Sequence, residues 1–185
     1  YLGKWYEIAR FDHSFERGLV GATANYSLRE DGKIKVLNTG YKDSFEGKFN
    51  EAEAKAYIPD ENYPGALKVS FFLFFYSDYW VLDLDENYTF ALIGSKKAKY
   101  LWILSRTPEM APADLDRVLN RATSLGYDTS ELIWVEHRDW LIGKNCQHIV
   151  KKSYWPVFEN TGPLHHENNH DNFSVDPRSC TIGGK

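Results

Sequence analysis

Three histidines cluster near the end of the chain and are the first side chains to consider for chemistry. His165 and His166 are followed by His170, with Glu167 and Asp171 beside them. Imidazoles at such spacing can bind zinc or copper. The surrounding segment has no sustained hydrophobic periodicity and is rich in asparagine and histidine, which is more typical of a flexible surface tract. We therefore expect no metal site.

Residues 1–138 carry little that could serve covalent catalysis. They contain no cysteine and no Gly-x-Ser-x-Gly motif, which marks the nucleophile of many hydrolases. Their histidines are His13, expected in a loop, and His137, expected after the last strand, so no catalytic pair is indicated. Cys146 and Cys180 lie in the last quarter of the chain, and the sequence does not decide whether they form a disulfide. We expect neither enzymatic activity nor a cofactor.

The composition excludes several classes of protein. The net charge is -4 and residues of both signs are interspersed, so the chain lacks the stripe of basic residues that nucleic-acid binding requires. No apolar run approaches the roughly 20 residues that a membrane-spanning helix needs. Aromatic residues make up 16% of the chain, which favours β-sheet and suits the wall of a cavity.

Eight segments have the pattern of β-strands and are separated by turn residues. The predicted strands are 5–11, 22–29, 33–41, 45–58, 66–72, 79–85, 88–95 and 100–106. Asp31-Gly32 is a hairpin signal between the second and third. Short loops between consecutive strands predict an all-β fold, an eight-stranded antiparallel up-and-down barrel without exposed edges.

One segment has helical periodicity, with an apolar stripe formed by Leu115, Val118, Leu119, Ala122 and Leu125. Pro112 at its start and Gly126 just past its end are the expected boundary residues. The narrow stripe predicts one α-helix packed outside the barrel, followed by a short ninth strand at 132–136. We expect one domain at 1–138, and a poorly ordered, irregular extension at 139–185.

The motif Gly3-x-Trp5-Tyr6-Glu7, with an eight-strand meander, one helix and a ninth strand, resembles the lipocalin family. Segments 5–13, 67–72 and 100–108 resemble its bacterial outer-membrane branch, related to apolipoprotein D, almost residue for residue. A second family motif falls at 86–88, where only Tyr88 matches, and the third is Arg106. The resemblance covers residues 1–138 and implies a binding or transport protein.

The two ends of the predicted barrel have different roles. If the strands run up and down, the first strand starts where the eighth ends, so Gly3, Trp5, Tyr88 and Arg106 share a closed floor. The Arg106 guanidinium can lie over the Trp5 indole, a contact worth about 1–2 kcal/mol when shielded from water. We expect these residues to be structural.

An eight-stranded barrel has room for one small ligand, and period-two alternation assigns its walls. Counting from Arg106 and Trp5 places six side chains inside: Leu104, Trp102, Tyr100, Glu7, Ala9 and Phe11. Other strands are expected to contribute Ile34, Val36, Asn38, Leu67, Val69, Phe71, Phe90 and Leu92, with Tyr57 near a polar headgroup. The resemblance to apolipoprotein D supports Trp102 and Asn38, whose matching positions line its pocket.

The loop around Phe74, Phe75 and Tyr76 is apolar where loops are normally polar. We interpret it as a lip at the mouth that contacts membranes or guides an acyl chain. The alternative is that it folds over and plugs the barrel. Lysines at positions 96, 97 and 99 in a neighbouring loop could attract anionic headgroups.

An apolar lumen with polar groups near its mouth suits a fatty acid or a lysophospholipid, and the resemblance implies the same class. Alternatives are a carrier of a retinoid, sterol or tetrapyrrole, and an envelope-stress or adhesion module acting through its mouth loops and tail. Peripheral membrane contact and a homodimer stay open. We expect a cell-envelope or extracellular protein. Because residue 1 is tyrosine, a signal or lipid anchor would lie upstream.

Overall fold

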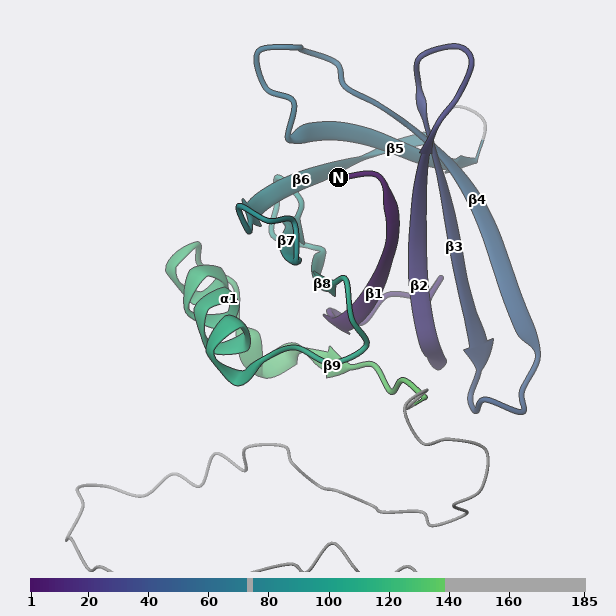
Figure 1. The fold of residues 1–185 in the computed structure, drawn as a ribbon, viewed down its shortest axis with the longest axis vertical. Helices are drawn as coiled ribbons and strands as arrows, with labels where there is room; N and C mark the ends of the chain where they lie inside the picture. The colour runs from purple at the N-terminus through teal and green to yellow at the C-terminus, as the bar shows by residue number, and fades with distance from the viewer. Residues whose placement is uncertain (73–74, 139–185) are drawn as a thin grey trace, which may run out of the picture. The chain divides into compact units, whose positions relative to one another are not determined.

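The computed structural model describes residues 1–72 and 75–138, without the side chains of residues 71, 72 and 75. Its strands are β1 (Gly3–Arg10), β2 (Leu19–Leu28), β3 (Ile34–Lys42), β4 (Phe49–Tyr57), β5 (Ala66–Phe72), β6 (Phe75–Leu84), β7 (Phe90–Gly94), β8 (Leu101–Ser105) and β9 (Ile133–Trp134). Consecutive strands from β1 to β8 pair antiparallel, and β8 pairs with β1. The first eight strands therefore close into the predicted barrel, with β1 to β4 on one side of it and β5 to β8 on the other (Figure 1).

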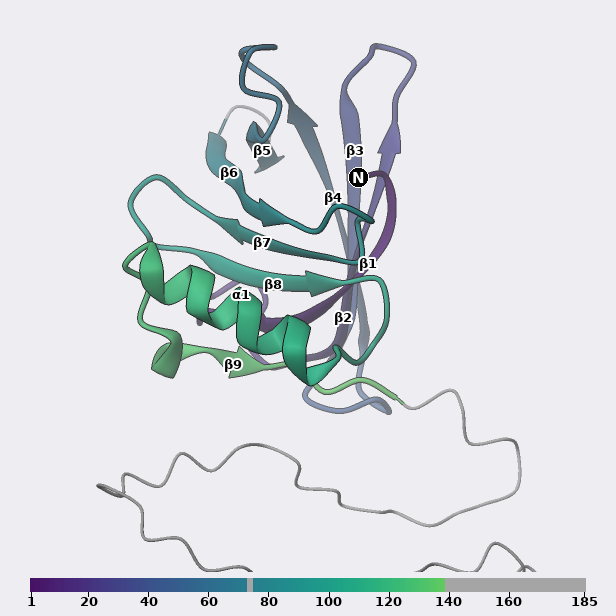
Figure 2. The ribbon, with the colours of Figure 1, turned by 60° about the vertical axis from the view of Figure 1, so that its left-hand side comes forward.

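Within the described residues the one α-helix, α1 (Pro112–Ser124), lies against the outside of β7 and β8 (Figure 2). It starts at the predicted proline and ends before Gly126, whose φ of +87° is a conformation that glycine adopts without strain. Val118 and Ala122, on the face of α1 that packs against the barrel, are fully buried. A 3₁₀ turn (Thr129–Glu131) leads into β9, which pairs with the outer end of β1 and thus confirms the expected ninth strand.

The barrel wall separates two hydrophobic clusters. The outer cluster lies between α1 and the wall and includes Ile8, Leu92, Leu101 and Ile103. The inner cluster lies on the lumen side of the strands and includes Trp5, Tyr26, Val36, Leu67 and Leu104. This division matters for the site, because the cluster to which a residue belongs shows whether its side chain faces the lumen or the helix.

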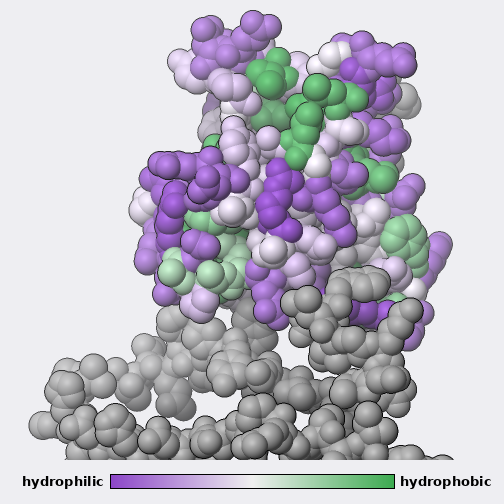
Figure 3. All heavy atoms as spheres, viewed as in Figure 1, coloured by the Kyte–Doolittle hydropathy of each residue, from purple (hydrophilic) through white to green (hydrophobic). Residues whose placement is uncertain are grey.

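Most of the barrel's outer surface seen in Figure 3 is hydrophilic, and apolar residues gather at the end near the start of the chain. The outer face of β4 carries exposed Glu51, Glu53 and Lys55, as its charge alternation predicts. Among the described residues, no helix has the length and apolar character that crossing a membrane requires.

The starts of two predicted strands differ from the structure by four residues each. β4 begins at Phe49 rather than at position 45, because residues 43–48 form the β3–β4 connection, where Gly47 approaches the carbonyl of Lys42 closely. β6 begins at Phe75, so the predicted apolar loop is wrong at Phe75 and Tyr76, which belong to a strand. Phe74, the expected extension 139–185 with its histidine cluster, and both cysteines lie outside the described residues.

Candidate functional site

A cavity of about 690 Å³, counting the space open to solvent at its mouth, lies on the inner side of the barrel wall. Seven residues expected on the wall line it: Glu7, Val36, Asn38, Val69, Tyr100, Trp102 and Leu104. Further lining residues are Ala24, Tyr26 and Tyr79 on the strands and Phe15 and Glu16 on the β1–β2 loop, with Ser77 and Asp78.

The prediction that Ala9, Phe11 and Phe90 line this cavity is wrong, because all three belong to the outer cluster beneath α1. The pairing of β1 with β8 shifts register between Glu7 and Ala9, which is a β-bulge. A bulge adds one residue to one strand, so the alternation inverts beyond it. Arg10 pairs with Trp102, which lines the lumen, so the Arg10 side chain points inward. Strict alternation had assigned the inward direction to Ala9 and Phe11 instead.

The error at Phe90 has a different cause. All five residues of β7 are buried, so the strand has no polar face from which to count. Ala91 and Ile93 pack on the lumen side, whereas Phe90 and Leu92 face the helix.

Two further predictions for the wall concern Tyr57 at the end of β4 and Phe71 near the end of β5. Tyr57 pairs with Lys68, whereas Ala56 pairs with the inward-facing Val69, so the Tyr57 ring lies on the outer face. There it packs edge-on against Tyr76, with ring centroids 5.2 Å apart. The expectation that Tyr57 contacts a headgroup in the lumen is therefore wrong. Phe71 lies in β5, and its side chain is outside the described part of the structure.

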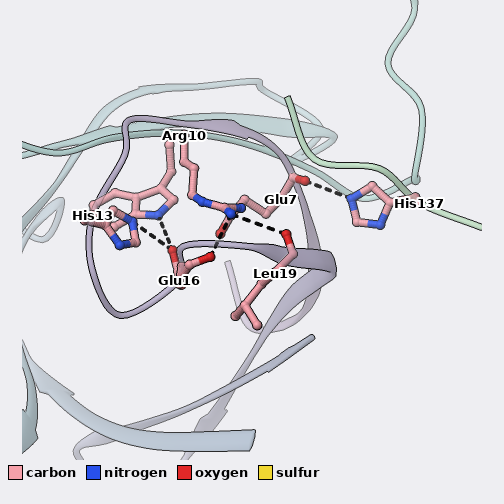
Figure 4. Close-up of polar contacts among 7 residues, drawn as sticks. Glu7, Arg10, His13, Glu16, Leu19 and His137 are labelled. Carbon is pink, nitrogen blue, oxygen red and sulfur yellow. Dashed lines mark hydrogen bonds and ion pairs between the residues drawn. The ribbon is translucent and has the colours of Figure 1, made fainter. Parts of the chain in front are cut away.

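A buried ionic cluster lies at the mouth of the cavity (Figure 4). Arg10, only 2% exposed, donates from Nη1 to Oε1 of Glu7 at 2.5 Å. Its Nη2 donates to the carbonyl oxygens of Glu16 at 2.7 Å and Leu19 at 3.3 Å. The guanidinium thus ties the β1–β2 loop to the inner wall, and an unpaired charge there would be costly.

Glu16 projects from this loop into the lumen. The indole Nε1 of Trp102 donates to its Oε2 at 3.0 Å, and Nε2 of His13 lies 2.9 Å from the same oxygen. The His13 contact is close but is not a well-directed hydrogen bond, and Nδ1 of that ring has no partner among the described residues. His13 also stacks on Phe15 with centroids 3.9 Å apart.

The two carboxyl groups of the cluster share one guanidinium, and their acidities separate. Burial and the nearby Glu16 carboxylate raise the pKa of Glu7 well above its usual range, and Arg10 offsets only part of this. Burial also acts to raise the pKa of Glu16, but the contacts with His13 and Trp102 hold it below its usual value. Glu16 therefore carries the negative charge that the cluster accommodates most readily.

Three tyrosine hydroxyls form a second polar group, on the inner side of the wall near the floor. The hydroxyl of Tyr79 is 2.8 Å from that of Tyr1 and 2.7 Å from that of Tyr26. Burial raises the pKa of Tyr26 and Tyr79 well above the usual range, so they stay neutral. Because Tyr79 also stacks near Trp102, with centroids 6.4 Å apart, this cluster adjoins the cavity wall.

The floor is closed by Arg106, whose guanidinium lies 3.8 Å from the ring centroid of the fully buried Trp5. Arg106 also donates to four backbone carbonyls, those of residues 1, 2, 4 and 88. Tyr88 thus contributes its carbonyl, while its side chain is 45% exposed. Gly3 has a φ of +95°, and a Cβ there would lie 3.4 Å from Nη1 of Arg106.

Among the site residues that the sequence patterns missed are Arg10, Glu16, Tyr26 and Tyr79. The hidden bulge explains Arg10. His13 and Glu16 are three positions apart in a segment expected to be a mouth loop, and that spacing was the available signal for their pairing. For Tyr26 and Tyr79, inward positions on β2 and β6 follow from the same alternation that placed Val36 and Val69.

Among the described residues, no group of three or more histidine, cysteine, aspartate or glutamate side chains is placed to hold a metal ion. His137 uses Nε2 to donate to the carbonyl of Glu7 at 2.8 Å, and burial lowers its pKa. His137 therefore binds the backbone of β1 and does not line the cavity.

A model of the lipocalin-like domain family matches residues 1–137. The chain belongs to the lipocalin family. Lipocalins bind hydrophobic ligands, and the barrel, the external helix and the lined lumen described above fit that role. The match covers almost exactly the described part of the chain, so the predicted family and fold are confirmed.

Relatives with this lipocalin domain include the outer membrane lipoprotein Blc of Vibrio cholerae, 50% identical over 139 residues, or 75% of this chain and 81% of the relative. Blc of Escherichia coli is also 50% identical, over 74% of this chain and 76% of its own length. Apolipoprotein D of Macaca fascicularis is 37% identical, over 71% and 72%. Among solved structures, lobster apocrustacyanin A1 shares the fold, with a TM-score of 0.61 and 18% identity over 75% of this chain and 78% of its own.

Proposed function

We propose that this lipocalin carries a single-chain acyl lipid, a fatty acid or a lysophospholipid, in the lumen of its barrel. The observation that supports the proposal is the composition of the cavity wall. Val36, Val69 and Leu104 provide an apolar surface, while charged and indole groups gather at one position near the mouth. A ligand with one long apolar part and one polar end matches that distribution.

The energetics favour such a ligand. Each methylene that moves from water into the lumen contributes about 0.8 kcal/mol. The polar end can stay beside Trp102 and the β1–β2 loop, where the indole N–H of Trp102 donates to Glu16 in this structure. A ligand that is apolar throughout would make no use of this polar position.

The proposal extends to the cell envelope, because several relatives are named outer membrane lipoproteins. On the β1–β2 loop, Phe15 is 50% exposed. On the β7–β8 loop, Lys96, Lys97 and Lys99 are exposed. These groups suit transient contact with an anionic bilayer from which the ligand is taken, since each lysine near such a surface contributes up to about 1 kcal/mol.

A fluorescent fatty acid titration tests the proposal. We expect saturable binding of one probe per barrel, with a change in the emission of Trp102, which alone among the tryptophans of the described residues lines the cavity. Val36→Trp fills the lumen and should abolish binding. Leu28→Trp, at a 67% exposed position, is the matched control and should bind normally. Equal binding by both variants would place the ligand elsewhere.

A further inference from the structure

Glu16 occupies an unusual position for a carboxylate on a loop. It lies between β1 and β2 (Figure 4), yet it is only 8% exposed, and it lines the cavity together with Trp102. Most glutamates on loops project into water. A buried carboxylate needs donors to compensate for lost hydration, and here they converge on a single oxygen.

The donors that face this oxygen come from two elements of the fold. Trp102 on β8 donates its indole N–H to Oε2 at 3.0 Å, and His13 on the loop brings Nε2 to 2.9 Å of the same atom. The guanidinium of Arg10 is close enough to donate to the backbone carbonyl of Glu16. Together they form a site inside the mouth that stabilises one negative charge.

We propose that the carboxylate of Glu16 is an internal placeholder, which occupies the position that the anionic group of an acyl lipid takes when the barrel is loaded. This inference rests on the proposed function and adds where the ligand's charged group sits. A carboxylate or a phosphate can accept from the same donors, Trp102 and His13, once the Glu16 side chain turns away. The carboxylate of Glu16 thus leaves the donors when the anionic group of the ligand binds to them.

The charge balance of the cluster supports this exchange. One guanidinium, Arg10, faces the two carboxyl groups of Glu7 and Glu16, and burial favours the neutral form of Glu7. With Glu16 turned outward, Arg10 keeps its contact with Glu7, whereas Trp102 and His13 lose the oxygen that they share. An incoming anionic group restores the same charge in the same place, whereas the amine of a zwitterionic headgroup finds no excess negative charge at these donors.

Backbone contacts make the exchange local. Arg10 holds the loop through the carbonyl oxygens of Glu16 and Leu19, not through the Glu16 carboxylate. The loop can therefore keep its position while one side chain rotates. This removes the two contacts to Oε2 and the contact with the Glu7 carboxyl.

The test compares Glu16→Ala with Asp12→Ala, a matched removal of a carboxylate from the same segment. Asp12 is exposed and pairs with Arg17 outside the cavity. The ligands are oleic acid and glycerol monooleate, which share an acyl chain but differ in charge. We expect Glu16→Ala to bind oleic acid about tenfold tighter than the original chain, because no internal anion competes for the same donors. Glycerol monooleate should bind all three proteins alike, and Asp12→Ala should match the original chain for both ligands.

Glu16→Gln provides a second variant that keeps the shape and packing of the side chain but removes its charge. We expect a smaller gain for oleic acid, and this variant decides the question if Glu16→Ala does not fold. A nuclear magnetic resonance spectrum of the Trp102 indole N–H gives an independent readout. The signal should shift upfield in Glu16→Ala, where the acceptor is lost, and return when oleic acid is added.

Two results would overturn the inference in different ways. If both lipids bind but oleic acid gains nothing in Glu16→Ala and Glu16→Gln, the placeholder role is wrong while the lipid-carrier function stands. If neither lipid binds to any of the proteins, the proposed function fails and the placeholder role fails with it. Weaker binding of a lysophosphatidylethanolamine to Glu16→Ala would also contradict it, since Glu16 would then contact the ligand's amine directly.

Discussion

The guanidinium of Arg106 lies 3.8 Å from the ring centroid of Trp5, although the two residues are at opposite ends of the barrel sequence. The contact joins the start of β1 to the residue after β8, the two strands whose pairing closes the barrel. Four hydrogen bonds from Arg106 to backbone carbonyls fix the same corner. Closure of the floor therefore depends on one planar side chain.

Arg106→Lys should lower the free energy of unfolding by about 2–3 kcal/mol, since an ammonium group can satisfy neither the stacking nor the forked hydrogen bonding. Urea denaturation measures this directly. Arg121→Lys, at an exposed position of α1, is the control and should change stability by less than about 0.5 kcal/mol. A loss of similar size in both variants would show that the floor contact contributes nothing particular.

Tyr88 offers a complementary test of the same corner. Its φ of 58° lies in the left-handed region, and it uses only its carbonyl to accept from Arg106. Tyr88→Gly should therefore leave stability unchanged or raise it by up to about 1 kcal/mol, because glycine adopts this φ without strain. The midpoint of thermal unfolding reports the effect. A clear loss of stability would mean that the exposed ring is needed after all.

Glu7 should make stability fall as the pH rises. Because burial raises its folded pKa above the unfolded value of 4.5, the folded chain binds the extra proton between these two values. The free energy of unfolding then decreases with rising pH across that window, by about 1.4 kcal/mol for each unit of the shift. Glu7→Gln should lose this slope and be the more stable protein at pH 7. Glu30→Gln, at an exposed position, should keep the original profile.

The hydroxyl of Tyr79 is the centre of the tyrosine cluster, so its removal should cost more than removal of an outer member. Tyr79→Phe removes the hydrogen bonds to both Tyr1 and Tyr26, which then keep only each other as partners, and should lower the free energy of unfolding by about 1–3 kcal/mol. Tyr26→Phe keeps one of the two hydrogen bonds and should cost about half as much. The opposite order, measured by urea denaturation, would contradict the assigned arrangement.

The fold could be predicted from the sequence because its signals are local and repeated. Alternation, turn residues and one apolar stripe place the strands and α1, and Gly3, Trp5 and Arg106 mark the ends that meet. The wall of the cavity was predictable where a strand has one polar face, as for Val36 and Trp102. It was not predictable where the register changes at a bulge before Ala9, or where β7 is apolar on both faces around Phe90.

The polar mouth was harder still, because it depends on contacts between distant segments. Nothing local to Glu16 shows that its carboxylate meets the indole of Trp102, which lies 86 positions away. Arg10 likewise acquires its role only when the β1–β2 loop folds back over the wall. Pairings of this kind are consequences of closure, and alternation along a single strand does not contain them.

Native mass spectrometry of the full chain, purified without detergent or added lipid, tests the central claim most directly. We expect one acyl lipid per barrel in the original chain and in Leu28→Trp, and none in Val36→Trp, whose lumen is filled. Recovery of a non-acyl ligand, of an empty barrel that takes up no fatty acid, or of equal amounts of lipid in Val36→Trp would contradict it.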